Sequence, residues 1–255
     1  MVTFSANLGF LWADLPLPRA IRAAKAAGFD AVECHWPYAT PTTEITAALR
    51  DTGLEMLGLN TPKSAGGIGQ FGLCALPGQE ALARSVVDKS LDFANEIGAR
   101  CLHVMAGIAS GPAAQESFCA ALTYACHQAK QSGGTILIEP LNRHDAPGYF
   151  LSSLAQAEEI ITSVNQSNLK LMFDCYHVGR TEGDVLTQLR ARLPLIGHIQ
   201  FASIPNRQSP DQGSLNYKQI FAAIESLGWS RPLGAEYHPG GATENSLDWM
   251  YTLKP

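Results

Sequence analysis

Eight short apolar runs, each followed by a longer amphipathic segment, limit the architectures that this sequence can adopt. Such an alternation is typical of repeated strand–helix units whose strands lie parallel in one sheet. Eight of these α/β units are the number that closes a (β/α)8 TIM barrel. The predicted strands are Phe4–Phe10, Ala31–Trp36, Leu54–Asn60, Cys101–Ala106, Thr135–Glu139, Lys170–Cys175, Leu195–Phe201 and Leu233–Tyr237.

Glycines at the ends of the amphipathic segments repeat with the same regularity. The first predicted helix, Pro18–Ala27, is followed by Gly28, and glycine suits the left-handed conformation that ends many helices. Four more predicted helices stop in the same way before a strand. A chain of 255 residues with 46% hydrophobic content can also bury one large core. We therefore expect a single barrel domain over residues 1–255, with helix stops at Gly53, Gly98, Gly133 and Gly228 as well.

Charge and cysteine content restrict the partners and the compartment. Eighteen Lys and Arg against 23 Asp and Glu give a net charge of −5, which supplies no positive field for nucleic acid or an anionic membrane. The six cysteines form no C-x-x-C pair, which favours a reduced, cytoplasmic setting. The N-terminus lacks the pattern of a signal peptide and no window is apolar enough for a membrane span, so we expect neither secretion nor membrane insertion. A homo-oligomer is compatible with the sequence.

Oxygen-bearing side chains end four consecutive predicted strands: Glu139, Asp174, Gln200 and Glu236. They follow one another by about one strand–helix unit, so all four should reach the carboxyl end of the barrel, where active sites of this fold lie. A lone carboxylate after a strand more often caps a helix, but four strand ends that behave alike favour a shared site. Three carboxylates and an amide oxygen suit Mg²⁺ or Mn²⁺ better than thiolate-seeking metals.

The histidines divide between the mouth of the barrel and its interior. His177 follows Asp174 by one helical turn and is predicted to reach the site. His103 and His35 fit either a pocket lining or a packed core. His198 shares the inward face of its strand with Gln200 but one layer deeper, which favours a core histidine. A fifth residue, His127, falls in a helical segment, where a structural or exposed role is expected.

Three loop features have two readings each. The irregular stretch Thr61–Gly78 is either a lid over the active face or a surface loop without a catalytic part. Arg207, in the loop after the seventh strand, is either a bidentate grip on a substrate carboxylate or hydroxyl, or a solvated arginine. Asp145 is either a substrate contact or a group that caps its own loop.

Several motifs together resemble the hydroxypyruvate isomerase family, a member of the xylose-isomerase-like TIM barrels. The resemblance implies a divalent metal on Glu139, Asp174, Gln200 and Glu236, with Glu139 and Glu236 also exchanging protons with the substrate. It further implies that His177, Asp145 and Arg207 contact substrate oxygens, and His103 is a fourth candidate. The similar motifs are Ala6–Leu8, Leu76–Gly78, His103–Gly107, Ile138–Asn142, Asp145–Phe150, Asp174–His177, His198–Gln200 and Glu236–Pro239.

The chain departs from that family pattern at the mouth of the barrel. The loop after strand seven usually reads Arg-His-Glu-Pro and then Gly-Glu, whereas here it reads Arg207-Gln208-Ser209-Pro210 and then Gly213-Ser214. His238 stands where the family has lysine, and His144 where arginine is frequent. Fewer fixed positive charges would then line the pocket, which bears on how a small anionic substrate is held.

The expected reaction is the conversion of hydroxypyruvate to 2-hydroxy-3-oxopropanoate (tartronate semialdehyde) through an enediolate, an intramolecular oxidation and reduction of a small sugar acid. The alternatives are 2-oxo-tetronate isomerisation, which uses the same tetrad, and 3-epimerisation of a ketose. A remoter alternative is a phosphodiesterase like the abasic-site endonucleases, which need more histidine ligands than this sequence offers. A sugar-acid binding protein without catalysis is the fourth reading.

Overall fold

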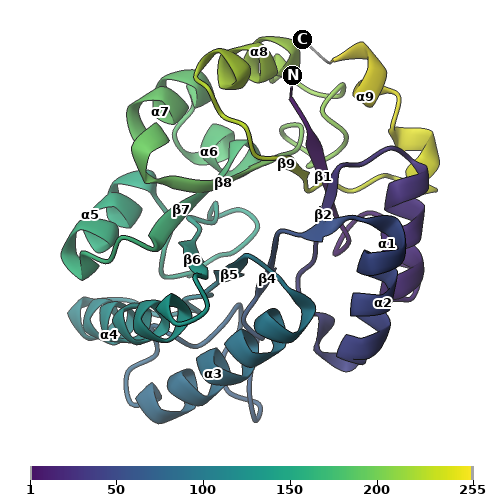
Figure 1. The fold of residues 1–255 in the computed structure, drawn as a ribbon. Coiled ribbons are helices and arrows are strands. Elements are labelled where there is room, and N and C mark those ends of the chain that lie inside the picture. Colours follow the sequence, from purple (N-terminus) through teal and green to yellow (C-terminus); the bar gives the residue numbers. More distant parts are fainter. Residues whose placement is uncertain (1, 254–255) are drawn as a thin grey trace.

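The computed structural model of the chain describes residues 2–253, in which strands and helices alternate along the sequence (Figure 1). The strands form the inner ring and the helices lie outside it, as expected for a TIM barrel. The strands are β1 (Phe4–Asn7), β2 (Ala31–Glu33), β3 (Glu55–Met56), β4 (Gly58–Asn60), β5 (Cys101–His103), β6 (Thr135–Ile138), β7 (Leu169–Asp174), β8 (Ile196–Phe201) and β9 (Leu233–Ala235).

The sheet closes on itself through the third predicted strand. Its order is β3-β2-β1-β9-β8-β7-β6-β5-β4 and every pairing is parallel. The two strands at the ends of this order, β3 and β4, are separated in the chain only by Leu57, whose amide N–H donates to the Val32 carbonyl at 2.7 Å. They are two pieces of one strand, so the predicted eight-stranded barrel is confirmed.

Most strands are shorter than the apolar runs from which they were predicted. The first ladder ends at Asn7, where the chain turns and the Phe10 amide donates back to the Asn7 carbonyl at 3.1 Å. The last strand likewise ends at Ala235, one residue before Glu236. The remaining residues of each run form the first part of the loop over the barrel. Their side chains therefore lie near the mouth of the barrel.

The helices begin and end near the predicted positions. Gly53 and Gly98 are left-handed C-caps, and Gly28, Gly133 and Gly228 also have positive φ just beyond a helix, which confirms the five predicted helix stops. The α-helices are α1 (Leu17–Ala26), α2 (Thr42–Thr52), α3 (Glu80–Ile97), α4 (Pro112–Lys130), α5 (Leu154–Val164), α6 (Cys175–Thr181), α7 (Val185–Arg192), α8 (Tyr217–Ser226) and α9 (Trp249–Thr252), and the 3-10 helices are η1 (Pro37–Ala39), η2 (Leu193–Leu195) and η3 (Thr243–Ser246).

The core lies between the sheet and the helices, and aromatic rings fill it where the chain ends meet. Phe4 on β1 and Phe201 on β8 both contact the Trp249 ring edge to face, at centroid separations of 4.9 and 5.2 Å. The six cysteines are free thiols. Among the described helices, none has the length and apolar content needed to cross a membrane. The predicted domain span of 1–255 includes Met1, Lys254 and Pro255, which lie outside the described residues.

Candidate active site

The four predicted metal ligands lie at the carboxyl ends of four adjacent strands. Glu139 follows β6, Asp174 ends β7, Gln200 is the register partner of Asp174 on β8, and Glu236 follows β9. Each of these residues is at most 5% exposed. Among residues 2–253, ligand atoms of Glu139, Asp174 and His177 lie within 4.8 Å of one another, close enough to share one ion. The prediction that strand ends supply neighbouring oxygen ligands therefore has a geometric basis on at least two strands.

A cavity of about 260 Å³ opens above these residues at the mouth of the barrel. Asp174 and Gln200 do not reach its wall; Gln200 instead lines a smaller cavity of about 20 Å³ inside the barrel. The site thus has two levels, an open chamber of substrate size and a buried polar layer beneath it. Six of the eight candidate residues line the chamber: His103, Glu139, Asp145, His177, Arg207 and Glu236.

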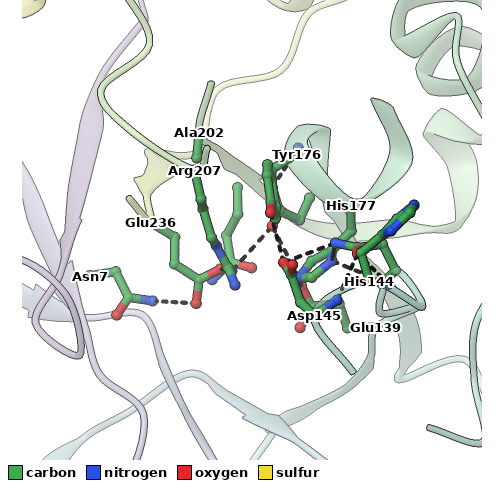
Figure 2. A network of polar contacts seen from close by, with 12 residues as sticks. Asn7, Glu139, His144, Asp145, Tyr176, His177, Ala202, Arg207 and Glu236 are labelled. Atoms are coloured by element: carbon green, nitrogen blue, oxygen red, sulfur yellow. Dashed lines mark hydrogen bonds and ion pairs between the residues drawn. The ribbon is translucent and has the colours of Figure 1, made fainter. Parts of the chain in front are cut away.

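Arg207 reaches into the carboxylate cluster and does not face solvent. Its Nη2 lies 2.6 Å from Glu236 Oε2 (Figure 2). The same atom lies 3.5 Å from Asp174 Oδ2. The arginine has φ 53°, a left-handed conformation that is strained for a residue with a side chain, and its carbonyl accepts a hydrogen bond from the His238 amide at 2.7 Å. The loop holds this strain while it aims the guanidinium at the site, so the pocket reading of Arg207 is the one that the structure supports.

Burial and mutual repulsion shift the ionisation of the carboxyl groups. Burial, together with the negative charges of Glu236 and Asp174, raises the pKa of Glu139 well above its usual value. Burial also raises the pKa of Asp174 to about 7, against the opposing effect of Arg207. Burial would raise the pKa of Glu236 too, but the Arg207 guanidinium and a hydrogen bond with His35 outweigh it and lower this pKa to about 2. One arginine is thus too little positive charge for the whole cluster.

Two buried oxygen atoms in the cluster lack a hydrogen-bond partner among the described residues. They are Glu139 Oε1 and Gln200 Oε1. A buried polar atom without a partner costs free energy, and such atoms are uncommon unless an ion or a water satisfies them. A hard divalent cation would satisfy both and would also offset the excess negative charge. The residues present therefore fit a divalent metal ion.

His177 is held in one tautomer by the loop after β6. Its Nδ1 accepts from the backbone amide of Asn142 at 3.0 Å and from the Asn142 side-chain amide at 2.8 Å. The hydrogen must then be on Nε2, which lies 3.7 Å from Asp174 Oδ2. Burial and the nearby Arg207 lower the pKa of His177 to about 3, so the ring is neutral and can donate one hydrogen bond into the cavity.

Asp145 is exposed at the rim of the chamber, where it takes part in a network with two neighbours. Its Oδ2 accepts from the Tyr176 hydroxyl at 2.7 Å (Figure 2). The same oxygen accepts from the Asn142 side chain at 3.0 Å. Its backbone amide donates to Asn142 Oδ1 at 3.1 Å, so Asn142 is the residue that caps this loop. The carboxylate of Asp145 is therefore available at the chamber wall, and the capping role expected as its alternative belongs to its neighbour.

The other histidines lie either at the chamber or away from it, according to their positions in the chain. His103 is 2% exposed, lines the chamber and has no hydrogen-bond partner among the described residues; burial lowers its pKa to about 4. His35 also lines the chamber, with Nε2 2.7 Å from Glu236 Oε1. His198 is buried in the deeper layer, as predicted, and His127 is exposed on α4.

Two buried polar residues at strand ends were absent from the sequence prediction. Glu33 ends β2 and Asn7 ends β1, and both lie in the inner layer beside Gln200. Asn7 Nδ2 donates to Glu33 Oε1 and to Glu236 Oε1, each at 3.0 Å. They lie inside the predicted runs Phe4–Phe10 and Ala31–Trp36, so the strand-end signal that identified the other four did not mark them; the structure ends both strands earlier.

Comparisons with known proteins match the barrel fold of this chain. The model of the xylose isomerase-like TIM barrel family matches residues 21–253. The chain is 38% identical to a 2-oxo-tetronate isomerase of Cupriavidus necator, covering 98% of each chain, and 38% identical to a putative hydroxypyruvate isomerase of Danio rerio, covering 97% of this chain and 94% of that one. A solved structure described as an AP endonuclease, family 2, from Brucella melitensis superimposes with a TM-score of 0.95 at 34% identity over 100% of both chains.

Proposed function

The chain belongs to the xylose isomerase-like TIM barrel family, and we propose that it is a metal-dependent isomerase of a small sugar acid. The observation that carries the proposal is the pair of buried carboxylates, Glu139 and Glu236, that line one small chamber from β6 and β9. Two other strands lie between these in the sheet, so the two side chains approach the chamber from different sides. Such a pair can exchange protons at two adjacent carbons of one bound molecule.

The proposed reaction converts hydroxypyruvate to 2-hydroxy-3-oxopropanoate. One carboxylate accepts a proton from C3, and the other carboxyl group delivers a proton to C2. The hydroxyl proton on the C3 oxygen is transferred to the C2 oxygen. C3 becomes the aldehyde and C2 becomes the secondary alcohol, so atoms and electrons balance within the substrate. Neutral His177 and the guanidinium of Arg207 would donate hydrogen bonds to the two substrate oxygens.

The metal would be held by Glu139, Asp174, Gln200 and Glu236. When bound, Mg²⁺ or Mn²⁺ supplies Lewis-acid stabilisation of the negative charge that develops on the two adjacent substrate oxygens. The protein's own contribution is to orient the substrate, to exclude bulk water from the buried layer and to hold the two proton-transfer groups. Support for this ligand set comes from the partnerless oxygens of Glu139 and Gln200 and from the excess of buried carboxylates over arginine.

A free cation at the rim favours an acid over a neutral sugar. Lys63 lines the chamber with Nζ 3.9 Å from the centre of the Trp36 ring, and among residues 2–253 no carboxylate pairs with it. Arg207, which also lines the chamber, pairs with Glu236 and Asp174 and is assigned above to the reacting oxygens, so it is not the group left for the carboxylate. We therefore assign the substrate carboxylate to Lys63, which comes from the loop of residues 61–78 and supplies a positive charge that the family pattern places elsewhere.

A 2-oxo-tetronate is the second candidate substrate, because the Cupriavidus necator relative bears that name. It carries the same pair of reacting oxygens with one additional carbon. Epimerisation of a ketose would use the same two carboxylates on opposite faces of a single carbon. DNA cleavage, suggested by the description of the Brucella melitensis structure, suits this chain less well, since a chamber of about 260 Å³ and a net charge of −5 favour a small ligand.

The test is a substrate screen with the purified protein and Mn²⁺ in deuterated water, followed by NMR. Hydroxypyruvate, 2-oxo-tetronates, free ketoses and an abasic-site DNA duplex are incubated separately. We expect conversion of the oxo acids with deuterium incorporated at the reacting carbon, and a Glu139→Gln variant as the inactive control. Inverted configuration in a ketose, or cleaved DNA with the oxo acids unchanged, would replace the proposed function with the corresponding rival.

A further inference from the structure

A fourth buried carboxylate lies beneath the three of the candidate metal site and outside the substrate chamber. Glu33 at the end of β2 is 4% exposed and lines only the inner cavity of about 20 Å³, together with Asn7, His198 and Gln200. A carboxylate at this depth is costly unless several donors surround it. It touches neither the chamber nor a guanidinium, so the charge balance of the chamber gives no reason for its presence.

Three donors converge on Glu33. Gln200 Nε2 lies 2.7 Å and Asn7 Nδ2 3.0 Å from its Oε1, while His198 Nε2 lies 2.6 Å from its Oε2. Strand β9, which lies beyond β1 from Glu33, makes room for it at Gly234, where an added Cβ would come within 2.6 and 2.7 Å of the two carboxylate oxygens. The barrel interior is therefore built around this one carboxylate.

The contact between Glu33 and Gln200 fixes the direction of the glutamine amide. An ionised carboxylate only accepts hydrogen bonds, so the NH2 end of the amide must face Glu33. The carbonyl oxygen, Gln200 Oε1, then lies at the other end of the amide, where it is buried without a hydrogen-bond partner among residues 2–253. A glutamine that was free to rotate would satisfy its oxygen elsewhere, and Glu33 prevents this.

Glu33 also connects to a second candidate ligand. The Asn7 amide nitrogen that donates to Glu33 Oε1 donates at the same time to Glu236 Oε1, at 3.0 Å in both cases. One buried carboxylate thereby positions a neutral ligand directly and an acidic ligand through Asn7. Partners of this kind are known to orient metal ligands and to tune their affinity.

We propose that Glu33 is a positioning residue that holds Gln200 with its carbonyl oxygen towards the metal ion. The inference rests on the proposed function, since it requires a cation at the ends of β6 to β9. The quantity that tests this inference is metal affinity and not turnover, so the inference and the proposed reaction can fail separately. If the wild-type protein binds Mn²⁺ but converts no sugar acid, the inference stands while the proposed reaction fails.

The decisive experiment is a double-mutant cycle on residues 33 and 200, with Mn²⁺ affinity measured by electron paramagnetic resonance of the free ion. Glu33→Gln replaces an obligate acceptor with a group that can also donate, so Gln200 is free to turn. We expect this change to weaken Mn²⁺ binding by about 10- to 100-fold. In a Gln200→Glu background the same change should lower affinity by no more than about twofold, because a carboxylate presents an oxygen in either orientation.

Glu55→Gln is the matched control. It removes one carboxylate from the adjacent strand β3, where Glu55 is exposed and pairs with Arg100, and should leave Mn²⁺ affinity unchanged. Thermal unfolding of each variant in EDTA shows whether the barrel remains folded. An equal loss from Glu33→Gln in both backgrounds would overturn the inference, because it would assign Glu33 a general electrostatic or structural role. Unchanged affinity in the single Glu33→Gln variant would overturn it too.

Discussion

Arg207, whose side chain is 16% exposed, forms an ion pair with the buried Glu236, with Nη2 and Oε2 2.6 Å apart, at the position where the proposed metal ion would need the same carboxylate. The guanidinium is flanked by the rings of Phe10 and Tyr176, whose centres lie 4.8 and 5.0 Å from its Cζ. The arginine thus supplies the positive charge that the cluster needs when no cation is bound. A bound metal ion would share Glu236 with Arg207. The contribution of Arg207 to stability should therefore be largest when no metal ion is bound.

Replacing Arg207 with glutamine should therefore destabilise the metal-free barrel. Removing one partner of a buried ion pair leaves an unpaired charge and typically costs about 3 kcal/mol. We expect the loss in urea unfolding with EDTA present, and a clearly smaller loss with Mn²⁺ present, since the ion replaces the missing charge. Arg231→Gln, which removes an arginine at the opposite end of the barrel, serves as the control. A loss that is equal with and without Mn²⁺ would contradict this role for Arg207.

Metal affinity should rise with pH through the neutral range. Burial raises the pKa of Asp174 to about 7 and that of Glu139 well above its usual value, so below neutrality both carboxyl groups hold protons that the ion has to displace. Calorimetric titration at pH 6 in buffers of different ionisation enthalpy should show proton release on Mn²⁺ binding, and less release at pH 8. Affinity that is constant from pH 6 to 8 would mean that these groups are already ionised.

The raised pKa of Asp174 should also make the metal-free protein less stable as the pH rises. The pKa of Asp174 is raised on folding from 3.8 to about 7, so the folded state binds the extra proton. Its contribution to stability is complete below pH 3.8 and is lost as the pH rises through 7. Urea unfolding in EDTA should show this decline in the wild type and a weaker decline in Asp174→Asn. A pH dependence that is identical in the two proteins would reject the raised pKa.

The paired carboxylates should be required for turnover and dispensable for folding. Glu139→Gln and Glu236→Gln keep the side-chain volume but remove a group that accepts a proton, and loss of general acid–base catalysis typically costs about 10²- to 10⁴-fold in rate. Removal of a metal ligand adds to this loss. Circular dichroism should show an intact barrel in both variants. Asp145→Asn, at the chamber rim, should change KM more than kcat, which separates contact with the substrate from proton transfer.

The strand-end rule recovered much of the site because it depends only on the period of the apolar runs. Glu139, Asp174 and Glu236 each come at the end of such a run, and closure of the barrel brings their strands together. Asn7 and Glu33 escaped the rule because they lie inside the predicted runs Phe4–Phe10 and Ala31–Trp36 and become strand ends only where the barrel ladders stop. The third strand was predicted as continuous because its break at Leu57 comes from pairing with two different neighbours, a tertiary effect.

The loop residues of the site could not be placed from sequence in the same way. Arg207 reaches the cluster because its backbone takes a left-handed φ of 53° and because the His238 amide donates to its carbonyl. Lys63 reaches the chamber through contacts across its own loop, where the Gly72 amide donates to the Lys63 carbonyl at 2.8 Å. Neither conformation follows from local propensity, so the sequence left Arg207 between a substrate grip and a solvated arginine and did not single out Lys63.

Lys63→Met should weaken binding of the acid without slowing the chemistry. An exposed ion pair contributes about 1 kcal/mol or less, so KM for hydroxypyruvate should rise by up to about fivefold while kcat stays the same. Dihydroxyacetone, which has a hydroxymethyl group in place of the carboxylate, should be handled equally by both proteins. Lys218→Met on the outer helix α8 is the matched control for loss of a lysine. If hydroxypyruvate and dihydroxyacetone lose affinity to the same extent, Lys63 acts through the shape of its loop and the substrate carboxylate binds elsewhere in the chamber.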